Sequence, residues 1–211
     1  MPAVQRHPQQ EAGTRPSRAL PYHLDVQEEA ASDALALRFV NEGSVAAVFH
    51  VYDRLKLAPG PRRYTVEPGL ALAGSWETGA DGAYDLWILG PGGFHRQFAG
   101  CIKKPGAPSI MAHADRTSGD FSLRLHNAGA APLTLTLQAN AYHDPAPAQL
   151  TLQAGEEVLY SWPGATCGHW YDASVTAAGG FLRRYAGRIE TGQDSISDPA
   201  QKTVSLPPAT R

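Results

Sequence analysis

The residue types that most often carry chemistry are sparse in this chain, and their spacing builds no recognisable site. The eight histidines form neither a His-Glu-x-x-His nor a His-x-His pattern, and the two cysteines lack the close spacing of a zinc site. His50 and Asp53 lie three residues apart and His143 adjoins Asp144, but neither pair makes a metal-ligand set. A Gly-x-Ser-x-Gly elbow, a Walker loop and a Gly-x-Gly-x-x-Gly turn are also absent. We therefore predict no catalytic residue, no metal ligand and no cofactor for this chain.

The strongest pattern is an internal repeat centred on residues 84–100. This stretch reads YDLWILGPGGFHRQFAG, and residues 171–187 repeat it as YDASVTAAGGFLRRYAG, 87 positions later. Eight of the 17 aligned residues are identical, where chance at ordinary composition gives about one. Asn-x-Gly and Ser-Trp anchors recur upstream at an offset of 86, so one residue is inserted between Trp162 and Tyr171. The chain is therefore a tandem duplication.

Each unit of the repeat contains seven short apolar runs separated by turns. The runs alternate in polarity, as in ALALRFV (34–40) and LTLTLQA (133–139), and turns rich in Gly, Pro and Asn follow them. Such alternation is typical of β-strands, and helical periodicity is absent. Seven strands in about 85 residues favour an immunoglobulin-like sandwich. The expected fold is all-β, with two tandem immunoglobulin-like β-sandwiches that derive from the internal repeat.

The apolar pattern also sets the expected domain boundaries. Residues 20–102 form the first β-sandwich repeat and residues 108–189 form the second. Residues 1–19 have almost nothing to bury, so we expect a linker or disordered segment there. Residues 190–211 lose the apolar pattern, and we expect a flexible tail.

Composition narrows the functional classes. The formal net charge of −2 and the lack of a Lys/Arg run give no reason to expect nucleic acid as a partner. No apolar stretch approaches membrane-spanning length, and the N-terminus lacks the apolar core of a signal peptide. Cys101 and Cys167 do not occupy matching repeat positions, which favours two unpaired thiols. The alternative that the sequence leaves is a single disulfide bridge between the two repeats.

The second copy of the hairpin fixes an expected register. Tyr171, Ala173 and Val175 alternate with polar residues and so define an inward face. A three-residue turn places Phe181 and Tyr185 on that same face, whereas a two-residue turn would place them outside. We therefore predict the three-residue turn.

This register turns Arg96 and Arg183 inward, each between two aromatic residues. Arginine commonly buries its aliphatic stem and keeps its charged head in water. We expect each arginine near a sandwich edge, with its head solvated or bonded to a loop carbonyl.

The outward face of the sixth strand differs between the copies. The second repeat carries Ser174 and Thr176 where the first carries Trp87 and Leu89. A Trp and a Leu on a nominally solvated face indicate that something covers them. Trp87 and Leu89 are therefore a candidate docking patch, against the other repeat, an absent domain or another chain.

Two further tryptophans, Trp76 and Trp162, each close a strand before a Gly-rich loop. A tryptophan in that place can anchor a protein at a lipid interface or cover a hydrophobic core. A sandwich fold favours the core, and both stay candidate interfacial aromatics.

Several motifs resemble the C-terminal region of bacterial phosphocholine-specific phospholipases C. They are RPSRALPY (15–22), VFHVYD (48–53), PRRYTVEPG (61–69) and the long hairpin at 84–100, and the resemblance covers roughly residues 15–198. It implies a secreted or periplasmic enzyme that hydrolyses phosphatidylcholine or sphingomyelin, with a duplicated β-domain after a large catalytic domain. The second repeat departs more from that pattern, and nothing here matches the catalytic domain.

The resemblance implies a non-catalytic accessory region of a phospholipase C. Its expected partners are the missing N-terminal catalytic domain and a phospholipid surface, and its role is support of that domain or targeting to lipid. The alternative is a structural or interaction module for stability, secretion or partner assembly. Because a linker-like stretch follows Met1 directly, we expect the chain to be part of a longer protein.

Overall fold

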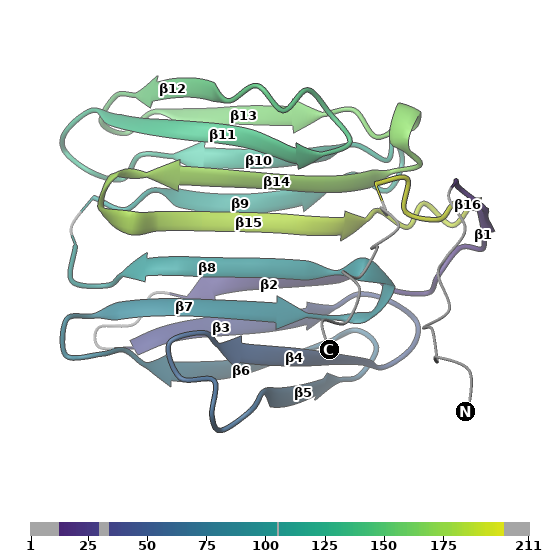
Figure 1. The fold of residues 1–211 in the computed structure, drawn as a ribbon, viewed down its shortest axis with the longest axis horizontal. Helices are drawn as coiled ribbons and strands as arrows, with labels where there is room; N and C mark the ends of the chain where they lie inside the picture. Colours follow the sequence, from purple (N-terminus) through teal and green to yellow (C-terminus); the bar gives the residue numbers. More distant parts are fainter. Residues whose placement is uncertain (1–12, 30–33, 105, 201–211) are drawn as a thin grey trace, which may run out of the picture.

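The computed structural model describes residues 13–29, 34–104 and 106–200, and β-strands dominate this part of the chain (Figure 1). Its only helical elements are three short 3-10 turns, η1 (Pro91–Gly93), η2 (Ala165–Cys167) and η3 (Ala178–Gly180). None of the described helical segments has the length and apolar character needed to cross a membrane. The all-β prediction is confirmed.

The first repeat forms the seven strands expected from its alternating residues. They are β2 (Leu24–Glu29), β3 (Ala34–Asn41), β4 (Ala47–Asp53), β5 (Arg62–Val66), β6 (Leu70–Glu77), β7 (Ala83–Leu89) and β8 (His95–Cys101). Strands β2, β3 and β6 form a three-stranded sheet in the order β2-β3-β6. Its inner face buries Leu35, Leu37 and Phe39, which are spaced two apart along β3 as the pleat requires.

The second repeat retraces this order. Its strands are β9 (Ser109–Ala114), β10 (Phe121–His126), β11 (Leu133–Ala141), β12 (Ala148–Leu152), β13 (Glu157–Trp162), β14 (Trp170–Ala177) and β15 (Phe181–Arg188). Strands β9, β10 and β13 form the second three-stranded sheet, in the order β13-β10-β9. The inserted residue falls between β13 and β14, in the loop that contains η2.

The remaining strands of both repeats join into one eight-stranded sheet, in the order β12-β11-β14-β15-β8-β7-β4-β5. The junction is the antiparallel pair β8 and β15, which runs from Ala99↔Leu182 to His95↔Ala186. Figure 1 shows the two small sheets behind this large one. Because each hairpin covers the free edge of the other, the junction leaves neither β8 nor β15 as an open sheet edge.

The hairpin register agrees with the prediction. Ala177 pairs with Phe181 across the three-residue turn Ala178–Gly180, and Tyr185 is buried. The two glycines shared by both copies have positive φ, for example 80° at Gly179 and 83° at Gly180. Residues other than glycine rarely adopt that backbone conformation, so the geometry of the turn explains why both hairpins contain Gly-Gly.

Parts of the expected linker and tail take part in the fold. β1 (Pro16–Ser17) pairs with β16 (Ser195–Ile196), and the Arg188 guanidinium contacts the Glu190 carboxylate at 2.7 Å beside them. The same Glu190 accepts a hydrogen bond from the Leu20 amide at 2.9 Å. The rest of those two expectations, at residues 1–12 and 201–211, lies outside the described residues.

Candidate functional site

The candidate docking patch lies on the outward face of the eight-stranded sheet. Trp87 and Leu89 are 36% and 39% exposed, while Leu86 and Ile88, their neighbours in β7, are buried inside the sandwich. The structure thus gives Trp87 and Leu89 the outward orientation that the register predicted. The partner in the docking hypothesis stays a prediction.

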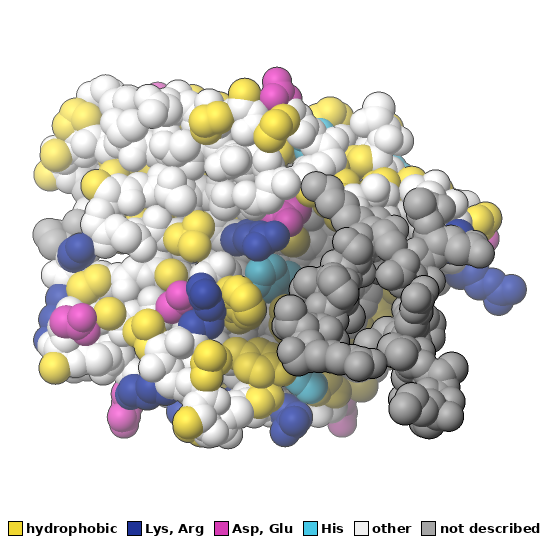
Figure 2. All heavy atoms as spheres, viewed as in Figure 1, with side chains coloured by type: hydrophobic (Ala, Val, Ile, Leu, Met, Phe, Trp, Pro, Cys, Tyr) yellow, Lys and Arg dark blue, Asp and Glu magenta, His cyan; other side chains and the backbone are white. Residues whose placement is uncertain are grey.

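Within the described residues, the side chains that contact the Trp87 ring, Arg54 and His95, both belong to the first repeat. The Arg54 guanidinium lies 4.4 Å from the Trp87 ring centroid and pairs with Asp85 at 2.9 Å. The His95 ring meets the Trp87 ring edge-on, with centroids 5.8 Å apart. In Figure 2 apolar side chains gather near the centre of the first-repeat half of this face, whereas the second-repeat half shows few charged side chains and scattered apolar ones.

His95 is a partly buried histidine at the border of this patch. Burial is the main cause that lowers its pKa from 6.5 to about 4, and the Arg184 charge acts in the same direction. Its Nε2 atom is buried and lacks a hydrogen-bond partner within the described structure. His95 is therefore neutral at physiological pH.

Trp76 and Trp162 do not serve as exposed anchors. They are 3% and 7% exposed and belong to the hydrophobic core. The Phe39 ring packs edge-on against Trp76, and the Phe121 ring stacks on Trp162. The interfacial interpretation of these two residues is wrong, because both lie on the inner face of a small sheet. Trp76 in β6 pairs with buried Leu35, and Trp162 in β13 pairs with buried Phe121.

The described cysteines form no disulfide with each other. Cys101 and Cys167 are both free thiols, and Cys167 is buried. Over residues 13–29, 34–104 and 106–200, no group of three or more His, Cys, Asp and Glu side chains could hold a metal ion.

The two inward arginines occupy equivalent places at the junction of the repeats. Arg96 in β8 and Arg183 in β15 are each only 2% exposed. Their guanidinium carbons lie 4.1 Å from the ring centroids of Phe94 and Phe181, respectively, which are also repeat equivalents. We expected each head to be solvated or bonded to a loop carbonyl. Both heads are instead buried, and the carbonyls that they bond belong to strands β8 and β15.

Their polar contacts follow the same internal symmetry. Arg183 donates to the Ala99 carbonyl at 2.7 Å and to the Tyr84 hydroxyl at 2.6 Å. Arg96 donates to the equivalent Ala186 carbonyl and to the equivalent Tyr171 hydroxyl, each at 3.1 Å. The sequence signal for this arrangement is the identity of Tyr and Arg in both hairpins, which the repeat alignment already contains.

The symmetry fails at the third partner. The Arg183 Nε and Nη2 atoms donate to the two carboxylate oxygens of Glu28, at 2.6 and 2.5 Å. Arg96 has only a distant Asp25 carboxylate, 3.9 Å from its Nη2, and its buried Nε has no partner among the described residues. Sequence reasoning missed Glu28, although it continues the inward face of Leu24 and Val26 along β2.

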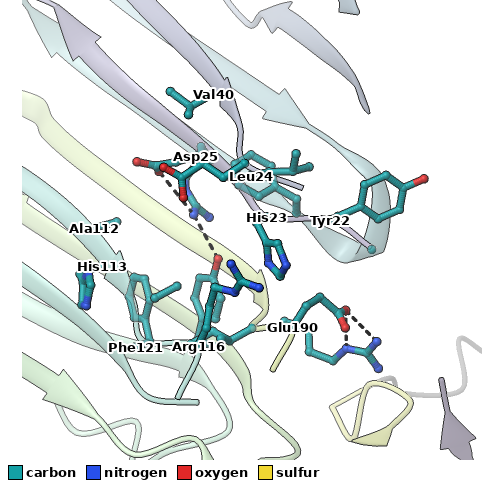
Figure 3. Close-up of a pocket in the computed structure, with 18 of the residues that line it drawn as sticks. Tyr22, His23, Leu24, Asp25, Val40, Ala112, His113, Arg116, Phe121 and Glu190 are labelled. Carbon is teal, nitrogen blue, oxygen red and sulfur yellow. Dashed lines mark hydrogen bonds and ion pairs between the residues drawn. The ribbon is translucent and has the colours of Figure 1, made fainter. Parts of the chain in front are cut away.

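A cavity of about 530 Å³ opens beside Arg96, between the edges of the two small sheets (Figure 3). Strand β2 lines one wall with Asp25, strand β9 lines the other with Ala112, and Arg96 and Tyr171 belong to the lining. His23 and Arg116 point toward one another from opposite walls (Figure 3). Burial, followed by the Arg116 charge, lowers the pKa of His23.

Comparison with known proteins places this arrangement in a family. The family described as bacterial phospholipase C, C-terminal domain, matches residues 16–101 and 108–188. A non-hemolytic phospholipase C of Pseudomonas aeruginosa is 40% identical over 217 residues, which cover 97% of this chain and 31% of that protein.

Two further relatives support the same family assignment. A non-hemolytic phospholipase C of Burkholderia pseudomallei is 40% identical, with 96% of this chain and 30% of that protein covered. A hemolytic phospholipase C of Pseudomonas aeruginosa is 31% identical, with 91% and 30% covered. The chain spans about a third of the length of these relatives. Since the family match takes in both repeats, the chain belongs to the bacterial phospholipase C C-terminal domain family.

Proposed function

We propose that this chain is a non-catalytic accessory region of an exported phospholipase C and that it supports the catalytic part of that enzyme. The observation that carries the proposal is the match of both repeats to a C-terminal domain family, by a chain that spans 31% of a related phospholipase C. The remaining length of such a protein is available for the catalytic domain. Each repeat, with a three-stranded sheet packed on four strands of the large sheet, fits an immunoglobulin-like sandwich.

The support has a candidate contact surface in Trp87 and Leu89, and we assign the catalytic part as its occupant. Val48 on the neighbouring strand β4 is 39% exposed and, with Leu89, lines a hollow of about 380 Å³. Tyr22, from the N-terminal segment of the chain, lines the same hollow. An exposed apolar patch with an adjoining hollow favours docking of a partner domain.

A hybrid enzyme tests this proposal. This chain replaces the aligned C-terminal region of the Pseudomonas aeruginosa non-hemolytic phospholipase C, and scanning calorimetry follows unfolding. We expect the catalytic part and this chain to unfold in one coupled transition. The Trp87→Ser, Leu89→Thr variant copies the second repeat and should split the transition into two.

The matched control is Ser174→Ala, Thr176→Ser, at the equivalent places of the second repeat. This control should keep the coupled transition. If both variants behave alike, Trp87 and Leu89 are not the docking surface.

A lipid-surface role is the second candidate, and one loop favours it. Leu55 and Leu57, between β4 and β5, are 57% and 61% exposed on either side of Lys56. Apolar side chains next to a cation suit a shallow, reversible attachment to a bilayer surface. Sedimentation with phosphatidylcholine vesicles tests it: Leu55→Ser, Leu57→Ser should abolish binding, whereas Trp87→Ser, Leu89→Thr should leave it unchanged.

A further inference from the structure

The chain contains its own comparison for the incomplete contacts of Arg96. Arg183 shares the backbone position, the aromatic neighbour and the tyrosine partner of Arg96, and it also holds the Glu28 carboxylate at two points. Arg96 has the equivalent backbone position, aromatic neighbour and tyrosine partner, but no carboxylate held at two points. A buried guanidinium with an unpaired N–H is costly, since burial removes the water that would otherwise satisfy it.

Strand register shows where the missing carboxylate would lie. Glu28 pairs with Leu37, and the repeat equivalent of Leu37 is Leu123. Leu123 pairs with Ala112, so Ala112 holds the place in β9 that Glu28 holds in β2. Ala112 lines the cavity that Arg96 lines. The short side chain of Ala112 therefore leaves open the space that a carboxylate fills in the other half of the molecule.

The size of the cavity agrees with this interpretation. The cavity beside Arg96 measures about 530 Å³. A cavity of this size holds a small molecule and the water around it.

The acidic groups that line the cavity have other partners or lie too far from Arg96. Asp115 accepts hydrogen bonds from the Thr117 and Ser118 amides. Asp25 accepts one from the Gln27 side chain, and its 3.9 Å separation from Arg96 Nη2 exceeds hydrogen-bond length. Glu190 is paired with Arg188, and Glu42 is exposed and has no contact with Arg96 in the described structure. The Nε–H of Arg96 is thus the directional donor left open.

We propose that the cavity between the repeats binds a small oxyanion, a phosphate group in particular, which Arg96 holds through Nε and Nη2 as Arg183 holds Glu28. Two oxygens of one anion match the two parallel N–H groups of a guanidinium. Phosphate suits the cavity better than a planar carboxylate because His23 and Arg116 also line it, on other walls, and a tetrahedral anion has oxygens left for them. This site does not depend on the accessory role proposed above.

The test uses inorganic phosphate and the purified chain. Calorimetric titration and the thermal midpoint follow binding to the wild type and to Ala112→Glu, which supplies the missing carboxylate. We expect saturable binding to the wild type and a loss of affinity of at least roughly tenfold in Ala112→Glu. Leu159→Glu adds the same charge to the same small sheet at an exposed position and should bind like the wild type.

His23 gives a second readout that does not need the Ala112 variant to fold. Phosphate beside Arg96 should raise the pKa of His23 in an NMR titration, and Arg96→Gln should remove that response. Absence of phosphate binding to the wild type, or equal binding to the wild type and to either cavity variant, would overturn the proposal.

Vesicles identify the source of the phosphate group. Sedimentation with phosphatidylglycerol vesicles that is lost in Ala112→Glu and kept in Leu159→Glu assigns a lipid headgroup. Binding of inorganic phosphate with the same dependence on Ala112, without vesicle binding, assigns a soluble phosphate.

Discussion

Glu28 in the first repeat and Arg183 in the second form a two-point ion pair across the junction, although 155 residues separate them in the chain. The Arg183 side chain is 3% exposed, and the Glu28 side chain is 26% exposed. Arg183 also donates to the Ala99 carbonyl. One guanidinium therefore joins β2, β8 and its own strand β15. Both repeats bury this guanidinium, and the first repeat supplies the Glu28 and Ala99 partners.

Removal of the Glu28 charge should destabilise the fold. Glu28→Gln keeps the shape of the side chain but leaves the buried Arg183 charge without its counter-ion. We expect a loss of about 2 kcal/mol in the free energy of unfolding, below the full range for buried pairs because Glu28 is partly exposed. Urea denaturation measures this loss.

Asp25→Asn is the matched control on the same strand. Asp25 lies 3.9 Å from Arg96 and has no two-point contact, so its replacement should cost less than about 0.5 kcal/mol. Equal losses in the two variants would show that charge on β2 matters and geometry does not.

The shared sheet predicts that the repeats unfold together. Strands β8 and β15 pair over Ala99↔Leu182 to His95↔Ala186, and one hydrophobic core contains residues of both repeats. We expect a single calorimetric transition with equal calorimetric and van't Hoff enthalpies. Two resolved transitions in the wild type would contradict this.

The hairpin register was predictable because both of its signals are local. Alternation around Tyr171 and Val175 fixes the inward face, and the Gly-Gly pair at 179–180 fixes the turn. The first copy supports the same register, with Tyr84, Ile88 and Gly-Gly at 92–93 in the equivalent places. Short-range sequence patterns were therefore sufficient to predict the register of this hairpin.

The joined sheet was not predictable in the same way. Backbone hydrogen bonds between β8 and β15 place few demands on side chains, so an edge-to-edge pairing has a weak sequence signature. The usable signal was an arginine on the inward face of both hairpins, Arg96 and Arg183, which a free sheet edge would have left solvated. Glu28 was missed because a glutamate at the end of a strand usually faces water.

The Asn-x-Gly anchors were recognised as turns, but their buried role was not. The Asn41 side chain donates to the Val45 and Val66 carbonyls, and its oxygen accepts from the Gly43 amide. Asn127 makes the same set of contacts in the second repeat, with the Gly129 amide in place of that of Gly43. Both side chains are buried, so the identity of Asn is a requirement of the loop and not only of the turn.

Replacement of either asparagine should be costly to a similar degree. Asn41→Ala removes the side-chain partner of two carbonyls and one amide, and Asn127→Ala removes that of three carbonyls and one amide. The loss of these buried hydrogen bonds predicts a cost of about 2 to 3 kcal/mol in each variant. Chemical denaturation of the two variants measures it. Asn140→Ala is a suitable control, because Asn140 is an exposed asparagine that bonds only to side chains. A loss in Asn140→Ala as large as in the other two would contradict the explanation.

The last prediction concerns pH and His95. Burial lowers the pKa of His95 in the folded chain to about 4, against 6.5 for an unperturbed histidine. Between these values the unfolded chain binds a proton that the folded chain does not, so stability rises with pH across this window. The contribution of His95 is fully present above pH 6.5 and is lost as pH falls toward 4. Partial exposure reduces the effect to about 1 to 2 kcal/mol.

The comparison of His95→Gln with the wild type isolates this contribution from that of the carboxylates. A glutamine side chain cannot take up a proton, so the variant should lose less stability than the wild type between pH 6.5 and 4. His113→Gln removes an exposed histidine and should keep the wild-type slope. Denaturant midpoints at a series of pH values provide the measurement. Parallel curves for the wild type and His95→Gln would mean that His95 takes up a proton in the folded chain as easily as in the unfolded chain. Its partial burial against the Trp87 ring and the nearby Arg184 charge both oppose such protonation.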